Sequence, residues 1–81
     1  MLLEILTPEK KLFSGDVQGV QLPGIDGLFE VLDRHAPLVS ALGVGNVKVL
    51  HKGSPSETYA IQGGFVEVLN NRVTVLLEGA Q

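Results

Sequence analysis

Two histidines, His35 and His51, are the side chains of this 81-residue chain with the most obvious chemical uses. His35 directly follows Asp33-Arg34, and a carboxylate beside an imidazole is a setting that perturbs histidine titration. Two histidines without a spaced third ligand do not predict a zinc site. We therefore expect His35 to form local hydrogen bonds or to lie in a partner interface. We expect His51, beside Lys52, to be a surface residue at a strand end.

Two glycine pairs, Gly24-x-x-Gly27 and Gly43-x-Gly45, resemble phosphate-binding loops in spacing alone. Neither is followed by the lysine and hydroxyl residue of a P-loop, and neither opens a convincing helix. No serine lies in a nucleophile-elbow setting, and a carboxylate pair such as Asp26 and Glu30 occurs in any surface loop. The sequence therefore predicts no catalytic residue, no cofactor and no metal.

Composition indicates one soluble domain over residues 1–81 with an apolar core, since 44% of the residues are hydrophobic. The absence of cysteine fits a reducing compartment. The net charge is −3, and Lys10-Lys11 are the only adjacent lysines, so nucleic acid is not an expected partner. Leu2–Leu6 is too short for a signal peptide, and no apolar run could span a bilayer. Any membrane contact is therefore expected to come through a partner.

The stretch Pro23–Ser40 is predicted to display a binding surface. It opens with turn residues, continues through four large apolar side chains between Leu28 and Leu32, and ends in Asp33-Arg34-His35 and Ala36-Pro37. An exposed turn, a buried anchor and a polar edge in sequence are typical of a binding region on a rigid scaffold.

Strands are expected to hold this stretch in place. The first half of the chain predicts strands over Leu2–Leu6, Lys10–Ser14 and Val17–Leu22, the last with a β-bulge near Gly19 because Val17 is out of phase. Leu28–Leu32 also fits a helix capped by Asp26, but its shortness favours a strand. The i,i+4 spacing of Leu38 and Leu42 suggests one short helical turn.

In the second half of the chain, apolar and polar residues alternate more clearly. Gly53–Ser56 is a turn, and Gly63-Gly64 indicates a sharp bend or a close backbone approach. Val66 and Val68 share one face, with Phe65 and Glu67 on the other. Asn70-Asn71 predicts a two-residue hairpin turn, because asparagine tolerates positive φ. Eight or more short strands in all predict an all-β sandwich or barrel.

Several segments together resemble the epsilon subunit of the F-type ATP synthase. They are Thr7-Pro8-Glu9, Leu12–Gly15, Pro23–Ser40, Gly63–Val68 and Val73–Leu76. They occur in the family's order and cover nearly the whole chain. The resemblance implies a flattened β-sandwich of about ten short, mostly antiparallel strands.

The resemblance also implies a non-catalytic rotor subunit that joins the gamma subunit of the central stalk to the ring of c subunits. It implies gamma contacts at Thr7, His35, Pro37, Ser40, Gln62 and Glu67. It implies ring contacts at Pro23, Gly24, Asp26, Gly27, Leu28 and Glu30. Such a subunit is monomeric when isolated, and in its complex it is peripheral to the cytoplasmic face of the bacterial plasma membrane or the organellar equivalent.

The chain departs from the family at two places. Many members have an acidic residue at Leu28, a glycine at Glu30 and Pro-Gly at Asp33-Arg34, so a charge has moved by two residues. Full-length members continue into an inhibitory two-helix hairpin where this chain has Glu78–Gln81, so neither inhibition nor ATP sensing is expected. The rival interpretations are a small-molecule-binding β-barrel and an enzyme that uses His35 with Asp33 or Glu67.

Overall fold

A computed structural model of the protein describes residues 1–78. Nine β-strands form over this range, without any helix, which confirms the all-β prediction with a strand count close to the expected ten. The strands are β1 (Leu2–Leu6), β2 (Lys11–Asp16), β3 (Gly19–Gly24), β4 (Gly27–Leu32), β5 (Leu38–Leu42), β6 (Gly45–Leu50), β7 (Glu57–Ile61), β8 (Gly64–Leu69) and β9 (Arg72–Leu77). Residues 79–81, where the resemblance expects the helical hairpin to begin, lie outside the described range.

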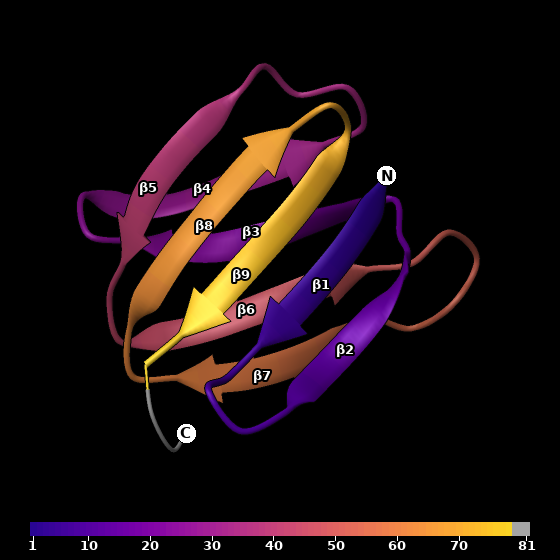
Figure 1. Ribbon diagram of the computed structural model, residues 1–81. Helices are drawn as coiled ribbons and strands as arrows, with labels where there is room; N and C mark the ends of the chain where they lie inside the picture. The colour runs from indigo at the N-terminus through magenta and orange to yellow at the C-terminus, as the bar shows by residue number, and fades with distance from the viewer. Residues whose placement is uncertain (79–81) are drawn as a thin grey trace.

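The strands form one curled sheet in the order β2-β1-β9-β8-β5-β3-β6-β7, with β4 paired to β3. Every pairing is antiparallel except that of β1 with β9. β5 and β3 share a single residue pair, Gly24 with Leu42, and the sheet folds over at this point. Figure 1 shows the two resulting layers crossing: β5, β8, β9, β1 and β2 form the front layer, and β4, β3, β6 and β7 form the back layer.

Apolar side chains from both layers fill the space between them. The alternation predicted for β8 and β9 is confirmed, because Val66, Val68, Val73 and Val75 are buried and Phe65 is exposed. Among the described residues, no polar or charged side chain is buried. The buried apolar residues are Met1, Leu3, Ile5, Val17, Val20, Leu22, Val31, Leu42, Val47, Val49, Ile61, Val66, Val68, Val73, Val75 and Leu77.

Three local predictions about β4 and two turns are confirmed. Residues 28–32 lie within β4, as their short length favoured. Asn70 and Asn71 have φ of 52° and 60° and close the β8–β9 hairpin, as expected of a two-residue turn. At Gly64 the backbone of β9 comes so close that an added Cβ would be 3.0 Å from the Leu77 Cα, which is the close approach predicted for the glycine pair.

Two local predictions are wrong. Leu38–Leu42 is strand β5, not a helical turn, because it pairs along its length with β8 and buries Leu42 against the core. No bulge occurs near Gly19, since β3 keeps a regular register with both β4 and β6. Val17 instead precedes the strand. Its side chain is buried in the core, and its N–H donates to the Met1 carbonyl oxygen at 2.8 Å.

Candidate functional site

The stretch Pro23–Ser40 reaches both ends of the back layer. Its first part is the turn between β3 and β4, and β4 then carries the chain about 20 Å away at roughly 3.3 Å per residue. The loop 33–37 therefore lies at the far end, where the Arg34 N–H donates to the Asn71 Oδ1 at 2.8 Å. What the sequence predicts as one display region is two separate surfaces.

The first surface, which we call the tip, consists of the β3–β4 turn and the neighbouring β5–β6 loop. The two turns are joined by a hydrogen bond from the Gly43 N–H to the Pro23 carbonyl oxygen, 2.8 Å long. Three apolar side chains extend from them, and each is about 70% exposed: Ile25 69%, Leu28 71% and Val44 75%. Exposed apolar side chains grouped on a turn are typical of a contact surface.

The six residues predicted to contact the ring lie on or beside the tip. Asp26, Gly27 and Leu28 are exposed, and Gly24 is half-buried. Pro23 is buried, because the β5–β6 loop approaches so closely that a Cβ on Gly45 would lie 2.7 Å from the Pro23 Cβ. Pro23 therefore supports the turn from beneath. Further along β4, the exposed Glu30 accepts a 3.1 Å hydrogen bond from the Gln21 Nε2.

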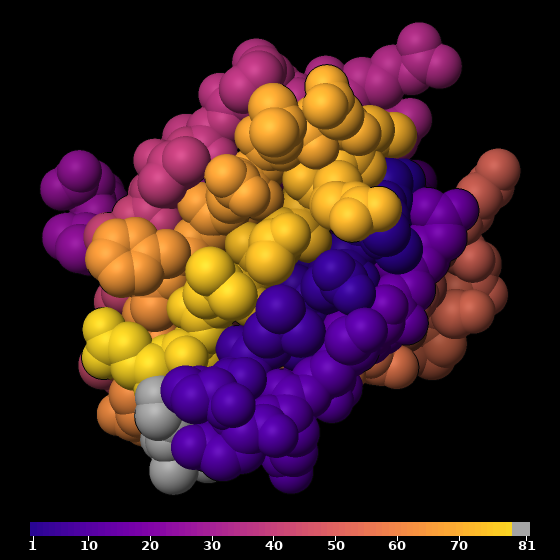
Figure 2. Space-filling view, viewed as in Figure 1, coloured from indigo at the N-terminus to yellow at the C-terminus, as the bar shows by residue number. Residues whose placement is uncertain are grey.

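The second surface is the outer face of the front layer. Ala41, Phe65, Leu76 and Leu6 are direct neighbours across β5, β8, β9 and β1 and form an apolar row. Phe65 and Leu76 are each about half exposed, at 53% and 49%. Figure 2 looks onto this face and shows the side chains of β8 and β9 covering its centre.

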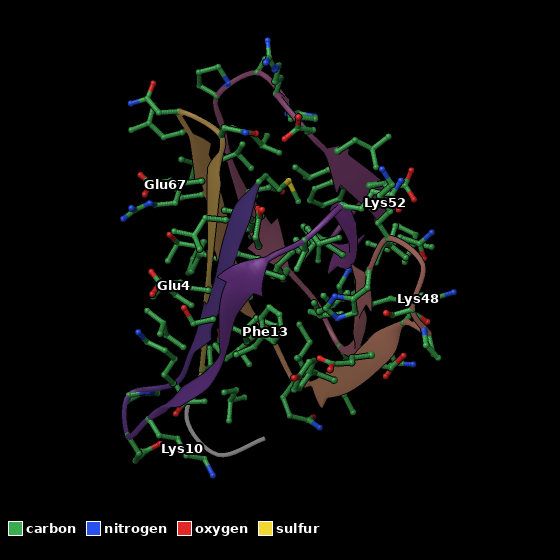
Figure 3. The ribbon with its side chains drawn as sticks, turned by 90° about the vertical axis from the view of Figure 1, so that its right-hand side faces the viewer. Glu4, Lys10, Phe13, Lys48, Lys52 and Glu67 are labelled. Carbon is green, nitrogen blue, oxygen red and sulfur yellow. The ribbon has the colours of Figure 1, made fainter. Side chains whose placement is uncertain are left out.

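A second row, polar except for Val39, crosses the same face beside the apolar one. Val39, Glu67, Thr74 and Glu4 are neighbours across β5, β8, β9 and β1. Figure 3 shows Glu67 and Glu4 extending from the same side of the layer, whereas Phe13 lies between the two layers. Glu67 is therefore solvent-exposed and lies in the middle of this face. The face mixes apolar and charged residues, which is the composition expected of a non-obligate interface.

Five of the six residues predicted to contact gamma lie on this face or at its ends, and Ser40 is the exception. Glu67 is central, and His35 and Pro37 lie in the loop 33–37 beside the β8–β9 turn. Ser40 does not share the outer face, because it pairs with Val66, whose side chain is buried, and opposed residues of two strands extend to the same side.

Thr7 and Gln62 lie at the opposite end from loop 33–37, since each follows the last residue of a strand that ends there, β1 and β7 (Figure 1). The Thr7 hydroxyl closes the β1–β2 turn: it accepts from the Lys10 N–H at 3.0 Å and donates to the Lys10 carbonyl at 3.1 Å. Gln62 is exposed in the β7–β8 loop.

His35 forms local hydrogen bonds, one of the two roles expected for it. Its backbone N–H donates to the Leu32 carbonyl oxygen at 3.2 Å. Its Nδ1 lies 2.7 Å from the Ala36 carbonyl oxygen, which only accepts, so Nδ1 is the donor in this contact. His51 follows β6 as expected but is half-buried, with its ring centroid 6.0 Å from that of Phe13.

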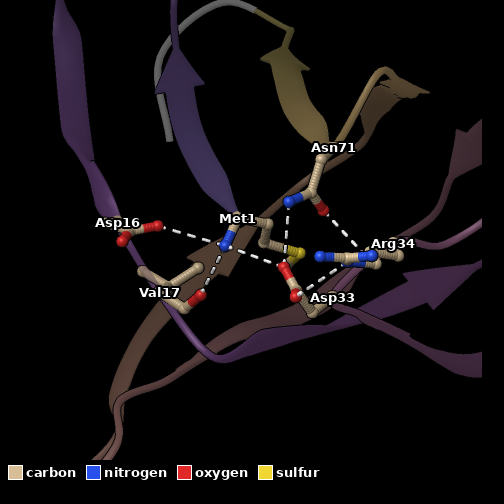
Figure 4. A network of polar contacts seen from close by, with 6 residues as sticks. All are labelled: Met1, Asp16, Val17, Asp33, Arg34 and Asn71. Carbon is tan, nitrogen blue, oxygen red and sulfur yellow. Dashed lines mark hydrogen bonds and ion pairs between the residues drawn. The ribbon is translucent and has the colours of Figure 1, made fainter.

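A polar network that sequence reasoning misses surrounds the amino group of Met1 (Figure 4). The ammonium donates to the Val17 carbonyl at 3.1 Å and forms ion pairs with the Asp16 Oδ1 at 3.1 Å and the Asp33 Oδ1 at 3.2 Å. Asp33 also accepts a 2.9 Å hydrogen bond from the Asn71 Nδ2. We call these five residues the amino-terminal network. No spacing predicts it, because its members are far apart in the chain.

The network favours charged forms of both its amine and its carboxylate. The hydrogen bond to Asp16 raises the pKa of the Met1 amine above its ordinary value of 8.0, although burial acts in the other direction. The hydrogen bond from Asn71, followed by that from the Met1 amine, lowers the pKa of Asp33 below its ordinary value of 3.8. Both groups are therefore ionised at neutral pH.

We expect the stability of the protein to fall as the pH rises above 8. The unfolded amine loses its proton near its ordinary pKa of 8.0, whereas the folded amine keeps it to a higher pH, so the network's contribution is complete below pH 8 and is lost through the folded pKa. Urea unfolding between about pH 6 and about pH 10 measures this. Asp16→Asn should flatten the alkaline decline, and an equal decline in both proteins would contradict the assignment.

A hollow of about 440 Å³ lies beside the network, lined by Met1, Asp16, Val17, Gln18, Asp33, His51, Lys52 and Ser54. Across the part of the chain that is described, no group of three or more histidine, cysteine or acidic side chains is arranged to hold a metal ion. Over the same residues, no helix has the length and apolarity needed to cross a membrane.

Comparison with known proteins identifies relatives along the whole chain. The family model for the ATP synthase delta/epsilon chain β-sandwich domain matches residues 1–81. The chain is 46% identical over its full length to the ATP synthase epsilon chain of Maridesulfovibrio salexigens and spans 56% of that protein. It is 43% identical to the epsilon chain of Chlorobium limicola, over 94% of this chain and 86% of that protein.

Solved structures share the fold. A chain of the Euglena gracilis mitochondrial ATP synthase, in a structure of its OSCP, F1 and c-ring, matches 93% of this chain with a TM-score of 0.86 and 23% identity, over 48% of its own length. A chain from the central stalk and c-ring of the Tetrahymena thermophila mitochondrial enzyme matches 96% with a TM-score of 0.82 and 15% identity, over 63% of its length. The sequence relatives and the family model together show that this chain belongs to the family of ATP synthase delta/epsilon chains, as their β-sandwich domain.

Proposed function

We propose that this chain is a non-catalytic subunit of the central stalk of an F-type ATP synthase, where it joins the gamma subunit to the c-subunit ring. Its location would then be peripheral to the membrane, through the complex. The observation that carries the proposal is the pair of separate exposed surfaces, the tip and the outer face of the front layer, on a domain whose relatives are epsilon chains. Two surfaces are what a coupling subunit needs, because it must hold two partners at once.

The outer face of the front layer is the proposed gamma-binding surface. It combines the apolar row centred on Phe65 and Leu76 with the exposed carboxylate of Glu67. Beside Glu67, a hollow lined by Leu69, Asn70, Arg72 and Thr74 can receive a side chain of the partner. The loop that carries His35 and Pro37 borders this face at the β8–β9 turn. Apolar anchors surrounded by charged groups provide affinity at the centre and orientation at the rim.

The tip is the proposed ring-binding surface. Its exposed apolar side chains, led by Leu28, are accompanied by the carboxylates of Asp26 and Glu30. The charge at Glu30, two residues after the family's usual acidic position, is held by Gln21 through their 3.1 Å hydrogen bond. The shifted charge therefore lies two residues further along β4, away from the turn. We expect the ring loops that this chain contacts to present their basic groups to β4.

Packing gives the rival interpretations little support. Apolar side chains of the described residues occupy the space between the layers, where a ligand-binding barrel would have its cavity. Asp33, the acid proposed to act with His35 in an enzyme, is bound instead to the Met1 amine and to Asn71. A coupling subunit needs neither a cavity nor an activated histidine.

Co-expression with the gamma subunit of the same genome tests the proposal. The tagged chain is expected to elute with gamma in a stoichiometric complex that withstands gel filtration. The matched control is the same chain with Phe65→Asp, which keeps the fold but puts a charge in the centre of the outer face. Elution of two folded but separate proteins would overturn the proposed gamma contact.

A further inference from the structure

Strand β4 lies at an edge of the back layer, as its uppermost strand in Figure 1. It pairs with β3 on one side, and among residues 1–78 no strand pairs with its other side. Its register with β3 is regular over six residues, and it contains no proline, lysine or bulge, the features that usually protect a sheet edge. The edge strand β2 differs, because it begins with Lys11 and its pairing with β1 is irregular near Leu6. β4 is therefore an edge that can accept another strand.

The pairing with β3 shows which backbone groups of β4 face this edge. Pro23, opposite Leu28, has no N–H, and its carbonyl oxygen accepts the Gly43 N–H at 2.8 Å, so its backbone groups point away from β4. In an antiparallel pair, opposed residues either face each other or both face away. The N–H and C=O of Leu28 therefore point away from β3. Because this direction alternates along a strand, the backbone groups of Glu30 and Leu32 face the same edge.

The side chains along this edge define the chemistry of a partner strand. Leu28 and Leu32 are 71% and 47% exposed on the outer side of the layer, and Glu30 lies between them as the one charged residue of β4. The 3.1 Å hydrogen bond from the Gln21 Nε2 holds the Glu30 carboxylate in place. A strand added beside β4 would place one side chain next to each of these three. Apolar residues fit beside the two leucines, and a basic residue fits beside the carboxylate.

The same carboxylate disfavours a second copy of this chain as the occupant. Two copies of β4 would pair antiparallel about a two-fold axis, and the register centred on Glu30 would put two carboxylates opposite each other. A shift of two residues would put each Glu30 opposite Leu28 or Leu32 and leave the charge without a partner. A strand of a different protein with a central lysine or arginine avoids both arrangements.

A hollow provides room for the inner side of such a strand. It measures about 230 Å³ and lies between β4, the β3–β4 turn and β5, with Gly27, Phe29 and Ser40 in its lining. Side chains of an added strand alternate, so the residue beside Phe29 would extend inward, to the side on which the Phe29 ring lies. Ser40 is half-buried and places its hydroxyl in this lining. A small residue such as threonine suits this position.

We infer that the outer edge of β4 is a strand-addition site for an extended segment of another protein, in which two apolar residues flank one central lysine or arginine at alternate positions. Backbone hydrogen bonds to Leu28 and Glu30 provide affinity, and the Glu30 carboxylate selects the basic residue. The inference does not depend on the proposed function. The edge runs along the side of β4, and it shares only Leu28 and Glu30 with the residues predicted to contact the ring.

Hydrogen exchange of the full chain, followed by nuclear magnetic resonance, tests this site with the capped peptide Ser-Val-Thr-Lys-Thr-Val-Ser. At about 5 mM peptide, a site with a dissociation constant of about 1 mM is largely occupied, so exchange of the Leu28, Glu30 and Leu32 amides should slow about fivefold. Exchange of the Phe29 and Val31 amides should not change, because these already bond to β3. Unchanged exchange at all three edge amides would overturn the inference.

A peptide with glutamate in place of the lysine is the matched control, and it should bind about fivefold more weakly or worse, because like charges then oppose each other. Equal binding of the two peptides would overturn the selection of a basic residue. Slower exchange of the edge amides at high chain concentration without peptide would mean that a second copy occupies the edge, which contradicts the proposed partner.

Two variants separate the roles of the backbone and of the charge at Glu30. Glu30→Pro removes an N–H that faces away from β3, and proline is tolerated on an edge strand, so this variant should fold but lose the response to peptide. A full response would overturn strand addition. Glu30→Gln keeps the backbone, so it should bind the lysine and glutamate peptides equally. If Glu30→Pro does not fold, the exchange pattern and Glu30→Gln still decide, since a lysine preference retained by Glu30→Gln would contradict the role of the carboxylate.

Discussion

Replacing Gly64 by alanine is expected to destabilise the protein by more than about 3 kcal/mol, which is most of the stability of roughly 5 kcal/mol that a domain of this size has. Gly64 begins β8 with φ of 153°, a conformation that side chains rarely adopt. A Cβ there would overlap the carbonyl oxygen of Leu76 and lie 3.0 Å from the Leu77 Cα. Because both obstacles are backbone atoms of β9, the two strands must separate to admit the methyl group.

Gly53→Ala is the matched control for this effect. Gly53 also has a positive φ, of 71°, but nothing lies within 4 Å of the position its Cβ would take. We expect it to cost about 1–2 kcal/mol, the conformational part alone. Urea unfolding followed by circular dichroism compares the two variants with the parent. If Gly64→Ala costs no more than Gly53→Ala, the backbones of β8 and β9 are not as close as the structure has them.

Strand positions can be predicted from the sequence where apolar and polar residues alternate. The alternation of Val66 and Val68 with Phe65 and Glu67 predicts both the strand and its buried face. In a strand with one solvent-exposed face, every second residue is buried. Leu38–Leu42 is different, since two leucines four residues apart fit a helical turn as well as a strand. The partner β8 decides in favour of a strand, and the identity of that partner is not contained in the local pattern.

The surfaces are less predictable than the strands. The tip and the loop 33–37 are adjacent in sequence but are separated by the length of β4, so local reasoning merges them. Ser40 is polar and lies near the predicted interface in sequence, yet its pairing with Val66 turns it toward the inside. Phe65 could have been recognised as a surface anchor, because it is the large apolar residue on the face opposite two buried valines.

The contacts of the amino-terminal network could not be predicted from the sequence. Met1 contacts Asp16 and Asp33, and Asp33 contacts Asn71, across separations that no motif describes. Each residue has an ordinary local explanation: a first residue, a strand end, a loop carboxylate, a hairpin asparagine. Only the parallel pairing of β1 with β9 brings the start of the chain beside the β8–β9 turn and so makes the contacts possible.

Phe65→Asp and Leu28→Asp are expected to separate the two proposed contacts. Each puts a charge at the centre of one exposed surface. Phe65 is 53% exposed and Leu28 71%, so each variant should still fold, with a loss of stability of about 1–2 kcal/mol. Phe65→Asp should weaken gamma binding by about 30-fold or more, because an anchor is lost and a charge must be desolvated, and it should leave binding to the isolated ring unchanged. Leu28→Asp should do the reverse.

Leu32→Asp is the matched control, since Leu32 is 47% exposed on the outer side of the back layer, at the opposite end of β4 from the tip. It should retain both partners. Affinity of the three variants and the parent for purified gamma, and for detergent-solubilised c-ring, measures the separation. Loss of both partners by Phe65→Asp would mean that one continuous interface includes the outer face and the tip. That result would contradict the division of the stretch Pro23–Ser40 into two surfaces, because a single partner contact would then reach both ends of β4.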